Sequence, residues 1–163
     1  MKTSPRACLF RLGTQLFALP GEYTRQVHTV SNLRPVPKAP AILRGLFPVR
    51  SNVLPLVTLE PLLGIEAVPL LGMDAGIEAK PLEYELAVQM EFEGRELAFG
   101  VTEVIGFDPL ERSVLKPVPL EMGKMRDLSI GVFMHAGEPV LMLDAEKLMI
   151  ALSRAFGVVR VVA

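Results

Sequence analysis

An internal repeat constrains the fold of this chain more than any other feature. Residues 45–63 align without a gap on residues 131–149, with a glycine at the start of each copy and a glutamate at the same place near its end. Two shorter matches precede this one in the same order: residues 33–37 with 115–119, and residues 13–16 with 94–97. A repeat at a fixed spacing indicates two copies of one supersecondary unit.

Short strands separated by turns dominate each copy. In the first copy, apolar runs at residues 8–12 and 15–19 flank Gly13-Thr14, which predicts a hairpin with a two-residue loop. Prolines in residues 33–40 forbid helix and keep that segment extended. Strands are expected at residues 45–50 and 53–59. About five short strands per copy favour a small barrel, because closure removes exposed strand edges.

The clearest helix lies near the end of the chain. Asp144 can cap it, and the residues that follow place one apolar face at helical spacing: Ala145, Leu148, Met149, Leu152 and Phe156. Residues 60–64 predict one further helical turn, closed by glycine. Residues 158–162 are expected to form a last strand that docks on the first barrel. We expect one domain over residues 1–163, with subdomain one at about 7–64, a linker at about 65–82 and subdomain two at about 83–157.

Composition excludes several classes of protein. Half of the residues are hydrophobic and 21% are charged, which rules out a disordered chain. Prolines and charges break every apolar stretch well before the roughly 18 residues of a spanning helix, so we expect no membrane insertion. Tryptophan is absent and the basic residues are scattered, which argues against nucleic-acid binding. The single cysteine, Cys8, indicates a reducing, cytoplasmic setting.

Charge is distributed unevenly along the chain. Residues 1–81 carry a net charge of +4 and residues 82–163 a net charge of −5. This pattern is equally typical of ordinary solvated surface and of two functional arrangements. A basic front could steer an acidic partner to one end, or the two halves could favour head-to-tail association.

Groupings that carry catalysis or metal binding are missing from the sequence. His28 and His135 lie at no ligand spacing to each other or to Cys8, and there is no nucleophile elbow and no phosphate loop. Cys8 lies between apolar neighbours and is expected to be an inert core residue. Glu91 and Glu93 alternate as on an exposed strand face. We therefore predict no catalytic residues, no cofactor and no metal.

Several motifs, in order, resemble the CheW-like domain family. The stretch from Gly45 through Arg50 to Leu59 is similar to the family's Gly, apolar run, Arg-Gly and Val-Ile-Pro-Val-Val-Asp-Leu strand. Upstream, residues 10–19 and Val27 match the opening hairpin and the following strand, and residues 97–104 resemble a Gly-x-x-Val-Asp-x-Val motif. The resemblance covers about residues 7–150. It implies a mainly β fold of two packed five-stranded SH3-like β-barrels, here with a C-terminal amphipathic helix.

The resemblance also implies a function. CheW-like proteins are non-catalytic adaptors that couple the signalling tips of methyl-accepting chemoreceptors to the regulatory domain of a CheA-type histidine kinase. Related proteins serve type IV pilus twitching. The expected location is the cytoplasm, with recruitment to membrane receptor arrays.

Departures from the family pattern affect the partners more than the fold. The family's Arg-Gly becomes Arg50-Ser51, and Thr29 stands where a glutamate is common, so a family-like Arg–Glu pair is not expected. Thr58 and Thr102 replace two aspartates of the family motifs.

Six residues are predicted to bind protein partners. The repeat partner of Arg50 is Ala136, so the barrel itself does not require arginine at that place, which favours an interface role for Arg50. The others are apolar candidates for a groove between the barrels that takes an amphipathic receptor tip, with a plain core position as the favoured alternative for each: Val27, Val30, Leu46, Phe99 and Val101.

Two alternative functions stay open. One is a β-barrel enzyme or small-ligand-binding protein that uses the groove between the barrels. The other is a scaffold that self-associates through its basic and acidic halves.

Overall fold

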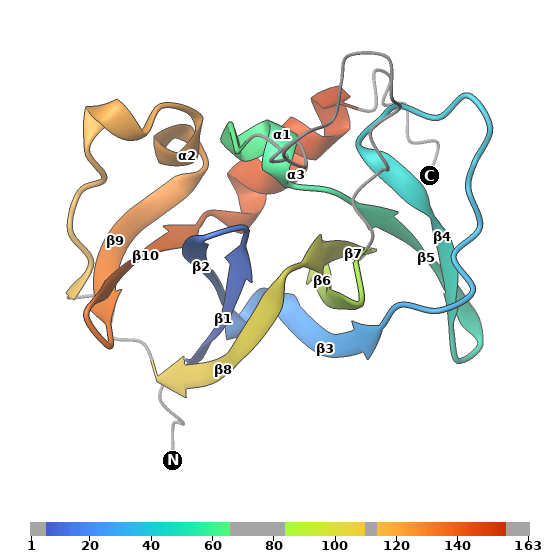
Figure 1. Ribbon diagram of the computed structural model, residues 1–163, viewed down its shortest axis with the longest axis horizontal. Helices are drawn as coiled ribbons and strands as arrows, with labels where there is room; N and C mark the ends of the chain where they lie inside the picture. The colour runs from blue at the N-terminus through green and yellow to red at the C-terminus, as the bar shows by residue number, and fades with distance from the viewer. Residues whose placement is uncertain (1–5, 66–83, 110–113, 156–163) are drawn as a thin grey trace, which may run out of the picture.

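Ten short strands form the framework of the protein in its computed structural model, which describes residues 6–65, 84–109 and 114–155 (Figure 1). The strands of the first half are β1 (Arg6–Leu12), β2 (Gln15–Pro20), β3 (Thr24–Thr29), β4 (Leu43–Val49) and β5 (Asn52–Val57). Those of the second half are β6 (Leu86–Phe92), β7 (Arg95–Val101), β8 (Glu103–Pro109), β9 (Ser129–His135) and β10 (Glu138–Leu143). The helices are α1 (Glu60–Leu63), α2 (Lys124–Asp127) and α3 (Ala145–Ala155), with 3-10 turns at Gly21–Tyr23 and Leu120–Met122. The predicted mainly β fold with an amphipathic helix near its end is confirmed.

The strands form two five-stranded sheets that exchange strands between the two halves of the chain. One sheet has the order β8-β1-β2-β10-β9 and the other β3-β6-β7-β5-β4. Each sheet therefore joins the opening hairpin of one half to the last three strands of the other. In Figure 1 the first sheet lies on the left and the second on the right.

The sheets do not follow the expected division into residues 7–64 and 83–157. β1 and β2 leave their own half, because β2 pairs in parallel with β10, and β7 likewise pairs in parallel with β5. The physical reason is that a parallel partner must come from a chain segment distant in sequence, whereas a hairpin pairs only neighbours. Most of the expected linker lies outside the described residues, as do residues 158–162.

The long sequence repeat corresponds to a structural repeat with the same register. β4 and β9 begin and end at aligned residues, and so do β5 and β10. The proline-containing segments upstream also lie in equivalent places. Arg34 forms a β-bridge with Leu46 in β4, and Lys116 forms the corresponding β-bridge with Val132 in β9. The shorter match at Gly13 is wrong by one residue. Leu12 pairs with Gln15 and Phe92 with Arg95, so Gly13-Thr14 corresponds to Glu93-Gly94.

Three apolar clusters form the core. A small one fills each sheet's own barrel, around Leu9 and Met142 on one side and around Phe47 and Leu56 on the other. The largest cluster lies between the two sheets and includes Phe10 and residues of both helices α1 and α3. Because this shared core takes side chains from both halves, each barrel depends on the other for burial of its apolar surface.

Both helices predicted from the sequence, α1 and α3, are present in the structure. α1 is one turn, closed by Gly64 in the left-handed conformation. Asp144 caps α3 by accepting a hydrogen bond from the Lys147 amide (N···Oδ1 3.1 Å). Four residues of the predicted apolar face are buried, Ala145, Leu148, Met149 and Leu152, and the fifth, Phe156, lies outside the described residues. Over the described ranges, no helix has the length and apolarity that crossing a membrane requires.

Candidate protein-binding surfaces

Arg50 lies at the tip of the β4–β5 hairpin. The loop is Arg50-Ser51, closed by the pair Val49 and Asn52, one residue earlier than the Ser51-Asn52 turn expected from sequence. Arg50 has a φ of +55°, in the left-handed region that residues with a side chain rarely adopt. Its side chain is exposed, and within the described part of the chain no hydrogen bond or ion pair is found for it. The guanidinium group is therefore free to bind a partner.

Apolar side chains accompany Arg50 on the outer face of this hairpin. Leu46 is 37% exposed and Val53 is 62% exposed. Pro48 pairs with Val53 and Leu46 with Pro55, so these side chains share one face. We call the exposed set Leu46, Pro48, Arg50 and Val53 the Arg50 surface. A free arginine beside exposed apolar side chains has the composition of an interface centre.

The Arg50 surface is suited to side-chain contacts rather than strand addition. β4 is the last strand of its sheet, but Arg34 and Leu46 exchange both backbone hydrogen bonds across its outer edge, each 2.8 Å long. Pro48 has no amide hydrogen to offer a further strand. A partner would therefore bind the face of the hairpin and not its edge.

The remaining candidates do not form one open groove. Val27, on edge strand β3, is half-buried against the shared core, whereas Val30 packs on the separate Phe47 cluster. Phe99 is fully buried and Val101 is 2% exposed. For Phe99 and Val101 the plain core alternative is the correct one, because β7 is an interior strand between β6 and β5. The unbroken apolar run of residues 97–101 is the sequence signal of such a strand.

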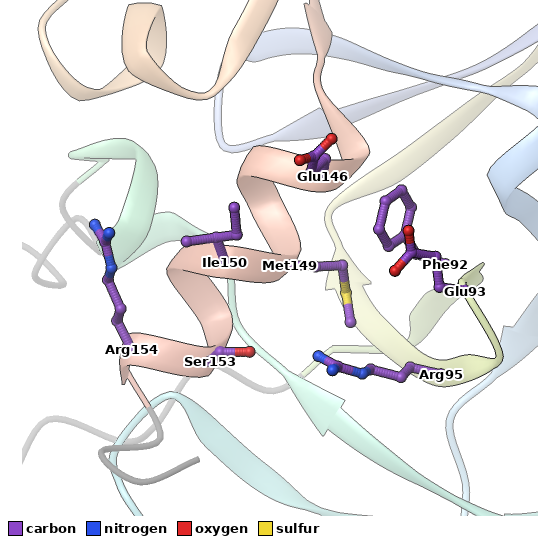
Figure 2. A pocket seen from close by; sticks show the side chains of 8 residues that line it. All are labelled: Phe92, Glu93, Arg95, Glu146, Met149, Ile150, Ser153 and Arg154. Atoms are coloured by element: carbon purple, nitrogen blue, oxygen red, sulfur yellow. The ribbon is translucent and has the colours of Figure 1, made fainter. Parts of the chain in front are cut away.

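A groove that sequence reasoning missed lies along α3. It has a volume of about 540 Å³ and is lined by eight residues: Phe92, Glu93, Arg95, Glu146, Met149, Ile150, Ser153 and Arg154. Figure 2 shows the β6–β7 turn on one side of the helix, with Arg95 reaching across toward Ser153. The only signal in the sequence is Ile150, an apolar residue off the buried stripe, which is 46% exposed.

The described residues offer no site for metal or nucleophilic chemistry. No group of three or more potential metal ligands occurs in the ranges that the structure describes. Cys8 is fully buried, and burial raises the pKa of its thiol to about 12, so the reactive thiolate is not formed near neutral pH. Glu91 pairs with Arg25 (Oε1···Nη2 3.0 Å), and the hydrogen bond from Arg25 lowers the pKa of this carboxyl. A general acid needs the opposite shift.

Comparisons with known proteins identify the family. Residues 6–152 match the CheW-like domain family. A 51-residue stretch is 34% identical to the chemotaxis protein CheW of Treponema pallidum (strain Nichols), covering 31% of this chain and 30% of that protein's length. The fold is similar to the crystal structure of the scaffolding protein TtCheW from Thermoanaerobacter tengcongensis. That match has a TM-score of 0.70 and 14% identity, over 91% of this chain and 89% of the other. The matched family spans nearly all of the described structure, and the chain belongs to the CheW-like domain family.

Proposed function

We propose that this protein is a non-catalytic adaptor that couples chemoreceptors to a CheA-type histidine kinase, in a chemotaxis or a pilus-twitching pathway. Proteins of the CheW-like family are scaffolds and adaptors without catalysis of their own. One relative bears the name chemotaxis protein, and one similar structure is of a scaffolding protein. The proposal places the protein in the cytoplasm, at membrane receptor arrays.

The observation that carries the proposal is the state of Arg50. Within the described structure, Arg50 is exposed and unpaired at the hairpin tip, and its repeat partner Ala136 has the same left-handed backbone, with a φ of +49°. The turn therefore requires this backbone conformation but not an arginine side chain, which leaves the side chain available for a partner. Two further basic residues lie on the segment that leads into β4: Arg34, which bridges Leu46, and Lys38. We assign the Arg50 surface to the regulatory domain of the kinase, through an acidic patch on that domain.

The receptor tip is assigned to a second place, around Val27. This residue lies on the edge strand β3 and is half-buried at the border of the shared core. An amphipathic helix of a receptor could cover that border with its apolar face. Val27 lies on β3 and Arg50 lies in the loop that follows β4, at opposite edges of one sheet, so the two partners can be tested separately.

A binding titration tests the assignment. The kinase regulatory domain and a receptor signalling tip are each titrated into the wild type and into Arg50→Ala and Val27→Asp variants. We expect micromolar binding of both partners by the wild type. Arg50→Ala should weaken kinase binding about tenfold, as loss of an interface arginine does, without affecting the receptor tip. Arg6→Ala removes the same charge from β1, in the other sheet and outside both proposed surfaces, and serves as the control.

Two results would contradict the proposal. If folded wild-type protein binds neither partner, the adaptor proposal fails and a small-ligand β-barrel becomes the better hypothesis. If Arg50→Ala and Arg6→Ala weaken kinase binding equally, the effect is one of overall charge and the Arg50 surface is wrong.

A further inference from the structure

The groove along α3 has an apolar floor. Met149 is nearly buried, and Ile150 and Phe92 lie beside it as partly exposed apolar side chains. From Glu146 to Arg154 the helix extends about 12 Å, at 1.5 Å per residue. A floor of this length accommodates about two turns of a second helix packed against α3.

The groove has a basic end and an acidic end. Figure 2 shows Arg95 and Arg154 on opposite sides of the half that contains Ser153, with Glu146 at the other end of the helix. Among the residues that the structure describes, neither arginine has an ion-pair or hydrogen-bond partner. Two unpaired guanidinium groups that flank an apolar floor are complementary to carboxylates on an otherwise apolar segment.

The other half of the molecule shows how the equivalent place is covered. There the short α1 ends at Gly64, and Ile65 packs on the shared core next to the β1–β2 turn, within 3.9 Å of the Cβ position of Gly13. α2 packs on α1 from the outside, with the Lys124 side chain 3.7 Å from the Cβ position of Gly64. By the repeat, Ile65 corresponds to Ala151, in the middle of α3. Because α3 continues where α1 has ended, no described segment turns back to cover its groove.

We propose that this groove binds an amphipathic helix of a partner protein, with apolar side chains on Met149 and Ile150 and carboxylates beside Arg95 and Arg154. The partner helix lies antiparallel to α3. This orientation places acidic residues in its own first turn, where they also stabilise the helix dipole, and keeps them away from Glu146 at the other end of α3. This surface is separate from the Arg50 surface, which lies at the far turn of β4–β5 (Figure 1).

Two synthetic helical peptides test the proposal. Both have leucines on one face, and they differ only in the first turn, which carries glutamates in one and lysines in the other. Each is titrated into the full-length protein while amide and isoleucine methyl resonances are followed by NMR. We expect saturable binding of the glutamate peptide, with shifts at Ile150 and at the β6–β7 turn. In the double variant Arg95→Glu, Arg154→Glu, we expect about tenfold weaker binding of this peptide and a preference for the lysine peptide.

The double variant Arg34→Glu, Arg50→Glu is the matched control, because it makes the same charge change away from the groove. It should leave the peptide preference unchanged, whatever it does to kinase binding, so this test stands apart from that of the proposed function. Four results would overturn the proposal: no binding of either peptide to folded protein, equal binding of both peptides, shifts outside the groove, or shifts at Ile150 that depend on protein concentration alone. The last would assign the groove to a second copy of the chain.

Discussion

At the scale of a single residue, the side chain of Arg50 argues for function, because the turn sets its left-handed backbone and Ala136 shares that backbone in the second copy. In the β1–β2 turn the first loop residue is Gly13, with a φ of +63°, and Thr14 after it has a negative φ. Arg50-Ser51 follows the same pattern, so Arg50 occupies a place that glycine fits without strain. A left-handed arginine costs on the order of 1 kcal/mol. Since Arg50 has no partner within the described structure, this cost is not offset by intramolecular contacts.

The pairing of Arg11 with Glu138 predicts a dependence of stability on pH. Arg11 donates two hydrogen bonds to this carboxylate, with N···O distances of 3.0 and 2.7 Å, and so joins β1 to β10. These bonds lower the pKa of Glu138 below its usual 4.5. A lowered pKa in the folded state stabilises the protein above the unfolded pKa, and this stabilisation is lost as pH falls through the folded value.

Melting temperatures between pH 7 and pH 3 measure this effect. Glu138→Gln should melt below the wild type at pH 7, and the difference should shrink toward zero below about pH 4. Glu103→Gln is the control, since the Arg11–Glu103 contact is longer, at 3.5 Å, and should have a smaller effect. A difference that stays constant over this range would show that the Glu138 charge contributes nothing.

Single residues show where prediction from the sequence succeeded and where it failed. Cys8 is buried as predicted, because its apolar neighbours on both sides mark an interior strand. Phe99 and Val101 lie in an unbroken apolar run of the same kind and are buried. Their assignment to an open groove was wrong because it did not use this signal. The exposure of Arg50 follows from a hairpin tip, whereas its left-handed backbone depends on the register of β4 and β5.

At the scale of elements, a close contact between Tyr84 and Gly100 holds β7 against the segment that enters β6. The ring of Tyr84 lies directly over Gly100, where a Cβ would overlap it. Tyr84 also donates a hydrogen bond to the buried Glu60 at the start of α1 (O···O 2.7 Å), and Thr58 donates another to the same oxygen at 3.0 Å. This network connects β5, α1, β7 and the segment that enters β6.

Gly100→Ala should therefore destabilise the protein by about 2 kcal/mol, because a methyl group placed in a packed site forces its neighbours apart. Chemical denaturation measures the change in unfolding free energy. In a Tyr84→Ala background the same substitution should cost much less, since the overlapping ring is gone. Equal costs in both backgrounds would contradict the close approach.

Elements were predicted well wherever the signal is local. The two hairpins of the first half, the cap of α3 and the glycine end of α1 each depend on a few neighbouring residues, and the structure confirms them. α2 was missed because four residues carry no periodicity. The groove along α3 was missed because Arg95 and Arg154 are distant in sequence and meet only through packing.

At the scale of the whole molecule, the exchange of hairpins makes the two halves depend on each other. Each sheet takes two strands from one half and three from the other. The repeat in the sequence indicated two similar units, but alignment alone does not say which copy supplies which strand. That information lies in the parallel pairs β2–β10 and β5–β7, which join residues far apart in the chain.

Fragments of residues 1–65 and 84–163 test this interdependence. Neither fragment alone should show a cooperative thermal transition, since each lacks the partner strands of both of its sheets. An equimolar mixture should regain β structure by circular dichroism and sediment as a one-to-one complex. A cooperative transition in either fragment alone would contradict the exchange.

The measurement that tests the adaptor account most directly compares stability and binding for one variant, Arg50→Gly. Glycine relieves the left-handed strain, so the free energy of unfolding should stay the same or rise by up to about 1 kcal/mol. Affinity for the kinase regulatory domain should fall about tenfold in the same sample. Unchanged affinity in a stabilised variant would contradict the assignment of Arg50 to the kinase interface.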